Sequence, residues 1–147
     1  MTSLTTEQEQ FGIKNFINKM QKDFEKWNIE KQKIHYKNES KLYHEREIWW
    51  CSLGVNVGFE QDGDGIEYQR PVLLFKSFSK NTCLIFPLTT SLTKHKMRMK
   101  IGMVDDKEAS VILSQPRLID NMRLVEKVGY LDKVTFENIR KTIKDML

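Results

Sequence analysis

Residues 70–90, RPVLLFKSFSKNTCLIFPLTT, place two apolar runs on either side of a short polar segment. The runs at residues 72–78 and 82–88 are rich in β-branched and aromatic side chains, which favour strands. Ser79-Lys80-Asn81 between them has the residue types of a tight turn. The stretch therefore predicts two neighbouring strands and a fold built mainly from β-structure.

Shorter runs of the same kind occur on both sides of this pair. Residues 47–53, 97–101 and 110–113 are also expected to be strands. Asp105-Asp106 marks a turn, and the glycines of residues 61–65 mark a flexible loop. Several short strands with compact turns are typical of a sandwich or small barrel rather than an α/β sheet.

Helical periodicity is confined to the two ends of the chain. One amphipathic helix is expected from Thr6 to about His35, and Thr6 and Glu9 have the spacing of a capping box. A second helix is expected from Asp132, whose carboxylate would cap it, to the C-terminus. The apolar stripe of the first helix comprises Ile13, Phe16, Ile17, Met20, Phe24 and Trp27. That of the second comprises Phe136, Ile139, Ile143 and Leu147.

The change from helical to strand periodicity divides the chain. Polar residues 37–41 lack periodicity and separate the first helix from the strands. The predicted organisation is a helical extension with its connector over residues 1–45 and a β-domain over residues 46–147. The extension is expected to pack on the β-domain, although it could instead dock on a second subunit or cover a binding groove.

Composition sets further limits. The net charge of +4 and the pI of about 9.0 permit a polyanionic partner without requiring one. The absence of a long apolar run and of a secretory pattern predicts a cytoplasmic protein without membrane contact. Cys51 and Cys83 lie in apolar runs and are expected to be free, buried thiols. No spacing is typical of a metal site, so neither metal nor cofactor is expected.

Four ordered motifs are more specific. Trp49-Trp50 opens a strand, GFEQ at residues 58–61 precedes the glycine-rich loop, and RPVLL at residues 70–74 begins the next strand. PLTT at residues 87–90 and SQPRLID at residues 114–120 follow. In this order and at these spacings, residues 46–147 resemble the PemK/MazF toxins, whose motifs are G-x-E-Q, R-P-V-L, a similar third-strand exit and D-Q-x-R-x-I-D.

The resemblance implies an α+β, mainly β fold: a small SH3-like barrel that ends in a helix, with the N-terminal helix as an addition. It also implies a homodimer that cuts single-stranded RNA at short sequences without metal and leaves a 2′,3′-cyclic phosphate. A cognate antitoxin would cover the RNA groove, and operator DNA would be contacted only through that antitoxin.

Three site residues follow from the resemblance. Arg70 matches the family's catalytic arginine, Thr89 its catalytic threonine and Glu60 the acid of its G-x-E-Q loop. Attack by a ribose 2′-oxygen adds negative charge to the phosphate, and a fixed guanidinium with a hydroxyl can stabilise that charge. Glu60 could accept the 2′-OH proton or orient Arg70, and the sequence leaves both roles open.

Other polar residues are candidates for RNA binding. As a strand, the basic run at residues 94–100 would carry its cations on one face, which suits either single-stranded nucleic acid or solvent. Arg117 could contact RNA or tie loops together through backbone carbonyls. The full set of candidate RNA contacts is Gln61, Thr90, Lys94, Lys96, Arg98, Lys100 and Arg117.

Two departures from the family pattern keep alternatives open. Ser114 stands where the family often has an acid, which favours a relative that binds RNA or antitoxin without cleaving. A sister branch of the fold inhibits DNA gyrase, and fold does not fix function. Asp62, Asp64 and Glu67 would repel RNA unless they form a movable gate. Retention of both Arg70 and Thr89 favours cleavage.

Overall fold

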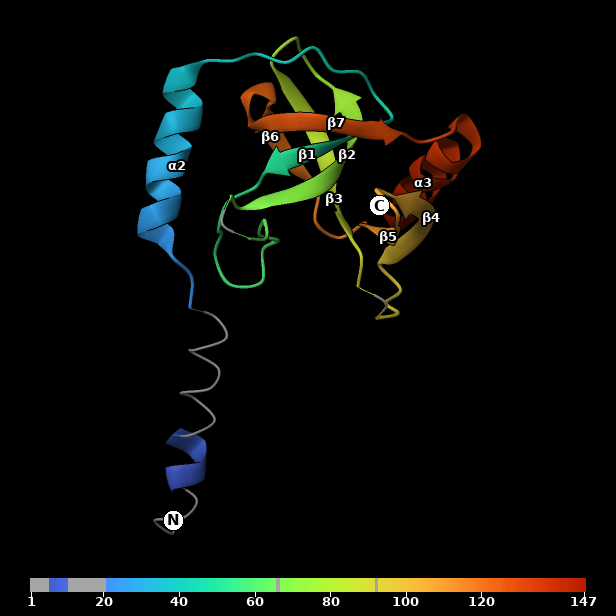
Figure 1. Cartoon of the computed structure of the whole chain (residues 1–147). Coiled ribbons are helices and arrows are strands. Elements are labelled where there is room, and N and C mark those ends of the chain that lie inside the picture. The colour runs from blue at the N-terminus through green and yellow to red at the C-terminus, as the bar shows by residue number, and fades with distance from the viewer. Residues whose placement is uncertain (1–5, 11–20, 66, 92) are drawn as a thin grey trace.

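The computed structural model of the chain describes residues 6–10, 21–65, 67–91 and 93–147. Residues 6–10 are helical. The remaining elements are α2 (Phe24–Lys37), β1 (Glu47–Ser52), β2 (Gln69–Ser77), β3 (Thr82–Thr89), β4 (Arg98–Val104), β5 (Lys107–Ile112), β6 (Arg117–Asp120), the 3₁₀ turn η1 (Asn121–Arg123), β7 (Leu124–Tyr130) and α3 (Lys133–Met146). The fold is mainly β with helices towards the two ends of the chain, as expected (Figure 1).

The strands form one curled antiparallel sheet. Their order is β4-β5-β3-β2-β1-β7, and β6 pairs with β3 outside this path. One edge of β3 pairs with β2, while the other pairs first with β6 and then, at Leu88 and Thr89, with Val111 and Ser110 of β5. Because β3 changes partner along its length, the sheet bends into a half-barrel (Figure 1).

Both faces of the central strands are buried, which explains their nearly continuous apolar sequences. Alternate residues enter two separate cores, since successive side chains of a strand point to opposite faces. In β2, Leu73 and Phe75 enter one core, whereas Val72 and Leu74 enter the other. The first core also contains Ile48, Phe86, Leu88, Val104, Ala109, Val111, Leu113, Leu131, Phe136 and Ile139. The second also contains Tyr43, Trp49, Cys51, Leu53, Cys83, Ile85, Ile119 and Leu124.

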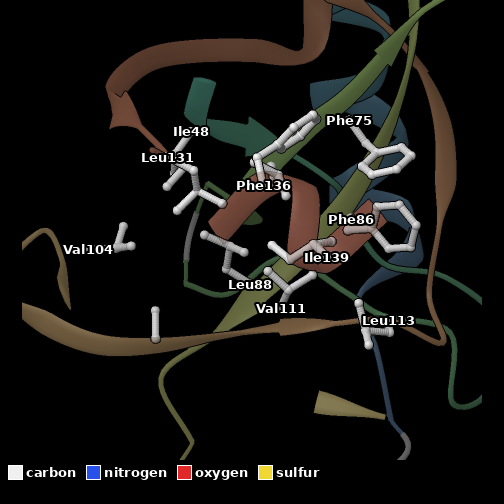
Figure 2. Packing of buried hydrophobic residues seen from close by; sticks show 12 residues of the cluster. Ile48, Phe75, Phe86, Leu88, Val104, Val111, Leu113, Leu131, Phe136 and Ile139 are labelled. Atoms are coloured by element: carbon white, nitrogen blue, oxygen red, sulfur yellow. The ribbon is translucent and has the colours of Figure 1, made fainter. Parts of the chain in front are cut away.

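Helix α3 closes the first core. Its expected start is confirmed, because Oδ2 of Asp132 accepts the backbone N–H of Thr135 at 3.0 Å. Figure 2 shows Phe136 and Ile139 among the side chains that project from the sheet. The ring of Phe136 lies 5.5 Å from that of Phe75. Leu147, expected on the same apolar face, is fully exposed.

The prediction of one helix from Thr6 to His35 is wrong. Residues 21–23 are not helical, and Asp23 begins a new helix by accepting the backbone N–H of Lys26 at 3.0 Å. A short carboxylate so placed competes with continuation of a preceding helix. Helix α2 ends at Lys37, where Asn38 adopts a left-handed conformation with φ of 53°. Ile13, Phe16, Ile17 and Met20 lie outside the described residues.

The side chain of Trp27 attaches α2 to the barrel. It is only 6% exposed, whereas Phe24 on the same helix is 51% exposed. The indole lies directly on Gly54, where an added Cβ would come within 2.0 Å of Cε2. The ring of Tyr68 lies 5.5 Å away, and the guanidinium of Arg123 lies 5.8 Å from the indole. Trp27 is therefore the buried side chain through which α2 packs on the β-domain.

The expected strands are present with shifted ends, but two further strands, β6 and β7, were not predicted. The idea that four cations share one strand face is wrong. Strand β4 begins at Arg98, so Lys94 and Lys96 precede it, and its register with β5 shifts between Lys100 and Gly102. The chain turns at residues 96–97 before it can extend.

The two cysteines are free and buried, as expected. Burial raises the pKa of the Cys51 thiol to about 12 and that of the Cys83 thiol to about 11. Both thiols therefore stay protonated at neutral pH. None of the helices within the described ranges has the length and apolar character needed to span a membrane.

Replacing Trp27 tests whether the extension is part of the folded domain. Trp27→Ala should lower the free energy of unfolding by about 3 kcal/mol, because it removes a buried aromatic side chain and leaves a cavity. Phe24→Ala, on the exposed side, should change it by about 0.5 kcal/mol or less. Chemical denaturation followed by circular dichroism measures both. Equal stability of the two variants would show that α2 does not contribute to the domain.

Candidate functional site

The start of β2 and the end of β3 meet at one end of the barrel. Val72 pairs with Pro87, so the antiparallel ladder brings Arg70 beside Thr89. Both residues line a cavity of about 420 Å³. Its other lining residues are Trp50, Asp64, Gly65, Glu67, Gln69, Pro71, Leu88, Thr90, Val104, Asp105, Lys107 and Ala109. The two residues that the family resemblance named as a pair therefore share one site.

Hydrogen bonds hold the guanidinium of Arg70 in a fixed orientation. Its Nε donates to the carbonyl oxygen of Asp62 at 2.7 Å, and its Nη1 donates to that of Leu88 at 3.0 Å. Its Nη2 donates to Oδ2 of Asp64 at 3.1 Å. Only 12% of the Arg70 side chain is exposed. The cation is thus oriented mainly by two backbone carbonyl groups, that of Asp62 on the loop after β1 and that of Leu88 on β3.

Burial is the main influence on the Arg70 guanidinium. Desolvation lowers its pKa, while the charges of Asp64 and Asp62 act in the opposite direction. An arginine in such a site still carries its charge at neutral pH. Arg70 can therefore stabilise an anion, and it is a poor donor of a proton.

Asp64 is the solvent-exposed partner of Arg70. Its side chain is 80% exposed, in contrast to the guanidinium that it contacts. Its backbone is fixed by hydrogen bonds in both directions with Gln69. A carboxylate paired with a guanidinium occupies the position in which a phosphate would bind. Asp64 and Glu67, suspected from the sequence to guard the site, both line this cavity.

Thr89 and Thr90 lie on the other side of the cavity. Thr89 is the last residue of β3, and its Oγ1 accepts the backbone N–H of Ser91 at 3.1 Å. A hydroxyl that accepts one hydrogen bond still has a proton to donate. Thr90 is exposed and follows the strand. Thr89 is therefore placed to donate a hydrogen bond to an anion beside Arg70.

Trp50 was not identified as a site residue from the sequence. It is half-buried and lines the cavity, whereas Trp49 points to the second core. Successive side chains of a strand point to opposite faces, and this alternation was the available signal. Lys107, at the start of β5, also lines the cavity. The site thus combines an aromatic surface with a second cation.

Glu60 lies in a neighbouring hollow rather than in the cavity of Arg70. Its Oε1 accepts the backbone N–H of Val57 at 2.9 Å. Glu60, Gln61 and Arg117 line a second cavity of about 210 Å³. Nη1 of Arg117 donates to the carbonyl oxygen of Leu53 at 3.1 Å, which is the loop-tying contact considered above. The carboxylate paired with Arg70 is that of Asp64.

The basic run contributes to a third hollow, of about 280 Å³. Lys94, Arg98 and Lys100 line it, together with Ser91, Thr93, His95, Glu108 and Ser110. Nη1 of Arg98 donates to the carbonyl oxygen of Thr93 at 3.3 Å. Lys96 is exposed in the turn before β4. The structure thus distributes the candidate RNA contacts over separate hollows, with Thr90 in the first, Gln61 and Arg117 in the second, and most of the basic run in the third.

No group of three or more histidine, cysteine, aspartate or glutamate side chains within the described part of the chain is placed to hold a metal ion. The cavity at the start of β2 and the end of β3 is lined by a buried guanidinium, hydroxyls, an ammonium and an indole, and also by the carboxylates of Asp64, Glu67 and Asp105. The first four kinds of group suit an anionic ligand with an aromatic part, which would compete with the carboxylates for the cations.

Comparisons with solved structures give the same fold. MazF from Deinococcus radiodurans superposes with a TM-score of 0.61 at 15% identity, over 73% of this chain and 97% of the relative. The toxin MazF-mt6 of Mycobacterium tuberculosis superposes with a TM-score of 0.52 at 15% identity, over 68% of this chain and 94% of the relative. A mycobacterial endoribonuclease in complex with its cognate antitoxin superposes with a TM-score of 0.51 at 14% identity, over 72% of this chain and 93% of the relative.

No curated protein matches the chain in sequence. The family model of PemK-like, MazF-like toxins of type II toxin-antitoxin systems matches residues 44–147. That range begins just before β1 and leaves out α2. It contains the cavity with Arg70 and Thr89. The chain therefore belongs to the family of PemK-like, MazF-like toxins.

Proposed function

We propose that this toxin is a metal-independent endoribonuclease that cuts single-stranded RNA and is neutralised by a cognate antitoxin. The observation that carries the proposal is the preorganised guanidinium of Arg70, which faces the same cavity as Thr89 and Trp50. The family relationship supports it, and so does the similar mycobacterial fold described as an endoribonuclease with its antitoxin.

The reaction uses the nucleophile of the substrate itself. The ribose 2′-oxygen forms a bond to phosphorus while the bond from phosphorus to the 5′-oxygen breaks, which yields a 2′,3′-cyclic phosphate and a 5′-hydroxyl. Arg70 and Thr89 stabilise the charge that grows on the phosphate oxygens. Glu60 is the proposed acceptor of the 2′-OH proton, and the leaving 5′-oxygen takes a proton from water. Glu60 must approach from the neighbouring hollow, on the loop that follows β1.

In this proposal, RNA follows the hollows around the cavity. Trp50 offers a ring for base stacking in the cavity itself. Lys94, Arg98 and Lys100 would contact phosphates on one side, while Gln61 and Arg117 would contact the strand on the other. A homodimer would place two such paths on one particle. An antitoxin would bind where it blocks them.

Arg70→Ala tests the proposed catalytic role. Cleavage should fall by about a hundredfold or more, because Arg70 binds charge that develops only in the transition state. Binding of a substrate with a 2′-deoxy sugar at the cut site should change much less. The control Arg98→Ala should instead weaken binding and reduce its salt dependence. Wild-type cleavage by Arg70→Ala would place the active site elsewhere.

Chelation tests the absence of metal chemistry. Cutting should continue at an unchanged rate in excess EDTA, because the proposed nucleophile is a ribose hydroxyl and the stabilising charge belongs to Arg70. Sequencing of the 5′ ends of cut RNA measures the activity and its motif together. If the wild-type protein binds RNA without any cuts, the chain is a non-cleaving relative.

Removing the charge of Asp64 should strengthen RNA binding. In Asp64→Asn the guanidinium keeps its two carbonyl contacts but loses its competing anion, so the dissociation constant for uncleavable RNA should fall severalfold. Glu67→Gln is a matched control, because it removes the same charge from the same cavity. The Glu67 carboxylate accepts a hydrogen bond from the side chain of Gln69, whereas that of Asp64 accepts one from Arg70. Fluorescence anisotropy compares the two. Equal effects would indicate general repulsion rather than competition for Arg70.

The proposed dimer is tested by light scattering. The full chain should have twice its monomer mass of 17.5 kDa at micromolar concentration. A mass equal to the monomer would contradict the proposed homodimer, and would require that one chain binds RNA through a single set of hollows.

A further inference from the structure

Lys22 makes an unusually complete set of contacts for a lysine near the N-terminus. Its Nζ lies 2.6 Å from the carbonyl oxygen of Asn56, 2.9 Å from that of Gly58 and 2.9 Å from Oδ2 of Asp62. A lysine ammonium has three N–H donors, so these acceptors can use all of them. The Lys22 side chain is 11% exposed. Its charge is therefore removed from solvent and fully paired.

The acceptors of Lys22 all belong to the loop that follows β1. Within that loop, Oδ1 of Asp62 accepts the backbone N–H of Asn56 at 2.7 Å. The side-chain amide of Asn56 donates to the carbonyl oxygens of Leu53 and Gln61, at 3.3 and 2.9 Å. Carbonyl dipoles and a carboxylate thus converge on one point. Without a cation there they would repel one another, so the loop geometry depends on Lys22.

Asp62 connects this network directly to the candidate catalytic residue. Its carboxylate binds Lys22, while its carbonyl oxygen accepts the 2.7 Å hydrogen bond from Nε of Arg70. A movement of Asp62 therefore displaces one of the two backbone acceptors that orient the guanidinium. The same loop carries Glu60, the proposed base. Lys22 thus lies two contacts away from Arg70.

A second contact fixes the extension to the base of the same loop. Trp27 packs on Gly54, and the carbonyl oxygen of Gly54 accepts the backbone N–H of Gly63 at 2.9 Å. Figure 1 shows α2 alongside the loop between β1 and β2. Lys22 and Trp27 therefore hold the loop from one side at two separate points.

Other lysines of the extension make a different kind of contact. Lys33 pairs with Glu30 three residues away and is 68% exposed, and Lys41 pairs with Glu39 two residues away. Such local, solvated pairs contribute little. Lys22 instead spans 34 to 40 positions of sequence and is nearly buried. Its contacts are those of a structural clamp rather than of a solvated surface lysine.

We propose that Lys22 is a positioning residue for RNA cleavage, which makes the N-terminal extension part of the active-site scaffold. The inference rests on the proposed function. Lys22 lies outside residues 44–147, the part matched by the toxin family model, so this role belongs to the extension of this chain. It acts through Asp62 on Arg70 and does not itself touch RNA.

The test uses the full-length protein with Lys22→Met, the conservative variant Lys22→Arg and the control Lys26→Met, which removes an exposed charge from α2. Amide hydrogen exchange at Asn56 and Gly63 measures the local stability of the loop, and exchange at Leu73 measures that of the core. Single-turnover cleavage at saturating RNA reports the reaction, and a 2′-deoxy substrate reports binding.

In Lys22→Met, exchange at Asn56 and Gly63 should speed up by roughly tenfold, while Leu73 should be unchanged. The saturated cleavage rate should fall by roughly tenfold or more, with little change in RNA binding, because a displaced guanidinium stabilises the transition state less well. Lys22→Arg should restore most of the rate. Lys26→Met should match the wild type in each measurement.

Three results would overturn the proposal. One is a cleavage rate of Lys22→Met equal to that of the wild type, whether or not the amides of its loop exchange faster. Another is faster exchange at Leu73 to the same extent, which would mean that Lys22 supports the whole fold. The third is an equal loss of cleavage rate in Lys26→Met, which would indicate a general effect of removing positive charge from the extension rather than of the Lys22 contacts. A wild-type protein that cuts no RNA would instead refute the proposed function, while exchange at Asn56 and Gly63 would still report whether the clamp exists.

Discussion

The change of partner along β3 is the constraint on which the rest of the structure depends. Its first half pairs with β6 and its end pairs with β5, while β2 pairs with its other edge from Cys83 to Pro87. A strand so enclosed has no free edge and buries both faces, with Phe86 and Leu88 in one core and Cys83 and Ile85 in the other. The bend between the two pairings opens the end of the sheet. At that opening, Nη1 of Arg70 donates a hydrogen bond to the carbonyl oxygen of Leu88.

At this opening lies the guanidinium of Arg70, whose hydrogen-bond donors are only partly paired by protein groups. Two contacts of the Arg70 guanidinium are with backbone carbonyls, which offset part of the cost of burying it. The third contact is with Asp64, which solvent reaches easily. A ligand that supplies a better anion needs to replace only this third contact. The guanidinium is oriented before any ligand arrives, which is the condition for effective electrostatic stabilisation.

Sequence patterns predicted the strands that carry apolar runs and missed β6 and β7. Strand β7 contains Glu126 and Lys127 and is mostly exposed, so its pattern lacks clean alternation. Strand β6 is only four residues long. Motifs identified Arg70 and Thr89 as a candidate pair because the family resemblance depends on residue type and order. The closeness of Lys22 to Asp62 depends on how α2 docks, and no local pattern contains that information.

The buried thiols have a practical consequence for studying motion in this protein. Surface cysteines have a pKa of about 8.5 and react with maleimides near neutral pH, whereas the raised pKa values of Cys51 and Cys83 keep both unreactive. A single Phe59→Cys change, at a position that is 80% exposed on the loop after β1, would therefore carry a spin label or fluorophore selectively. The natural chain is already a suitable background for spectroscopy of the loop after β1, without prior removal of cysteines.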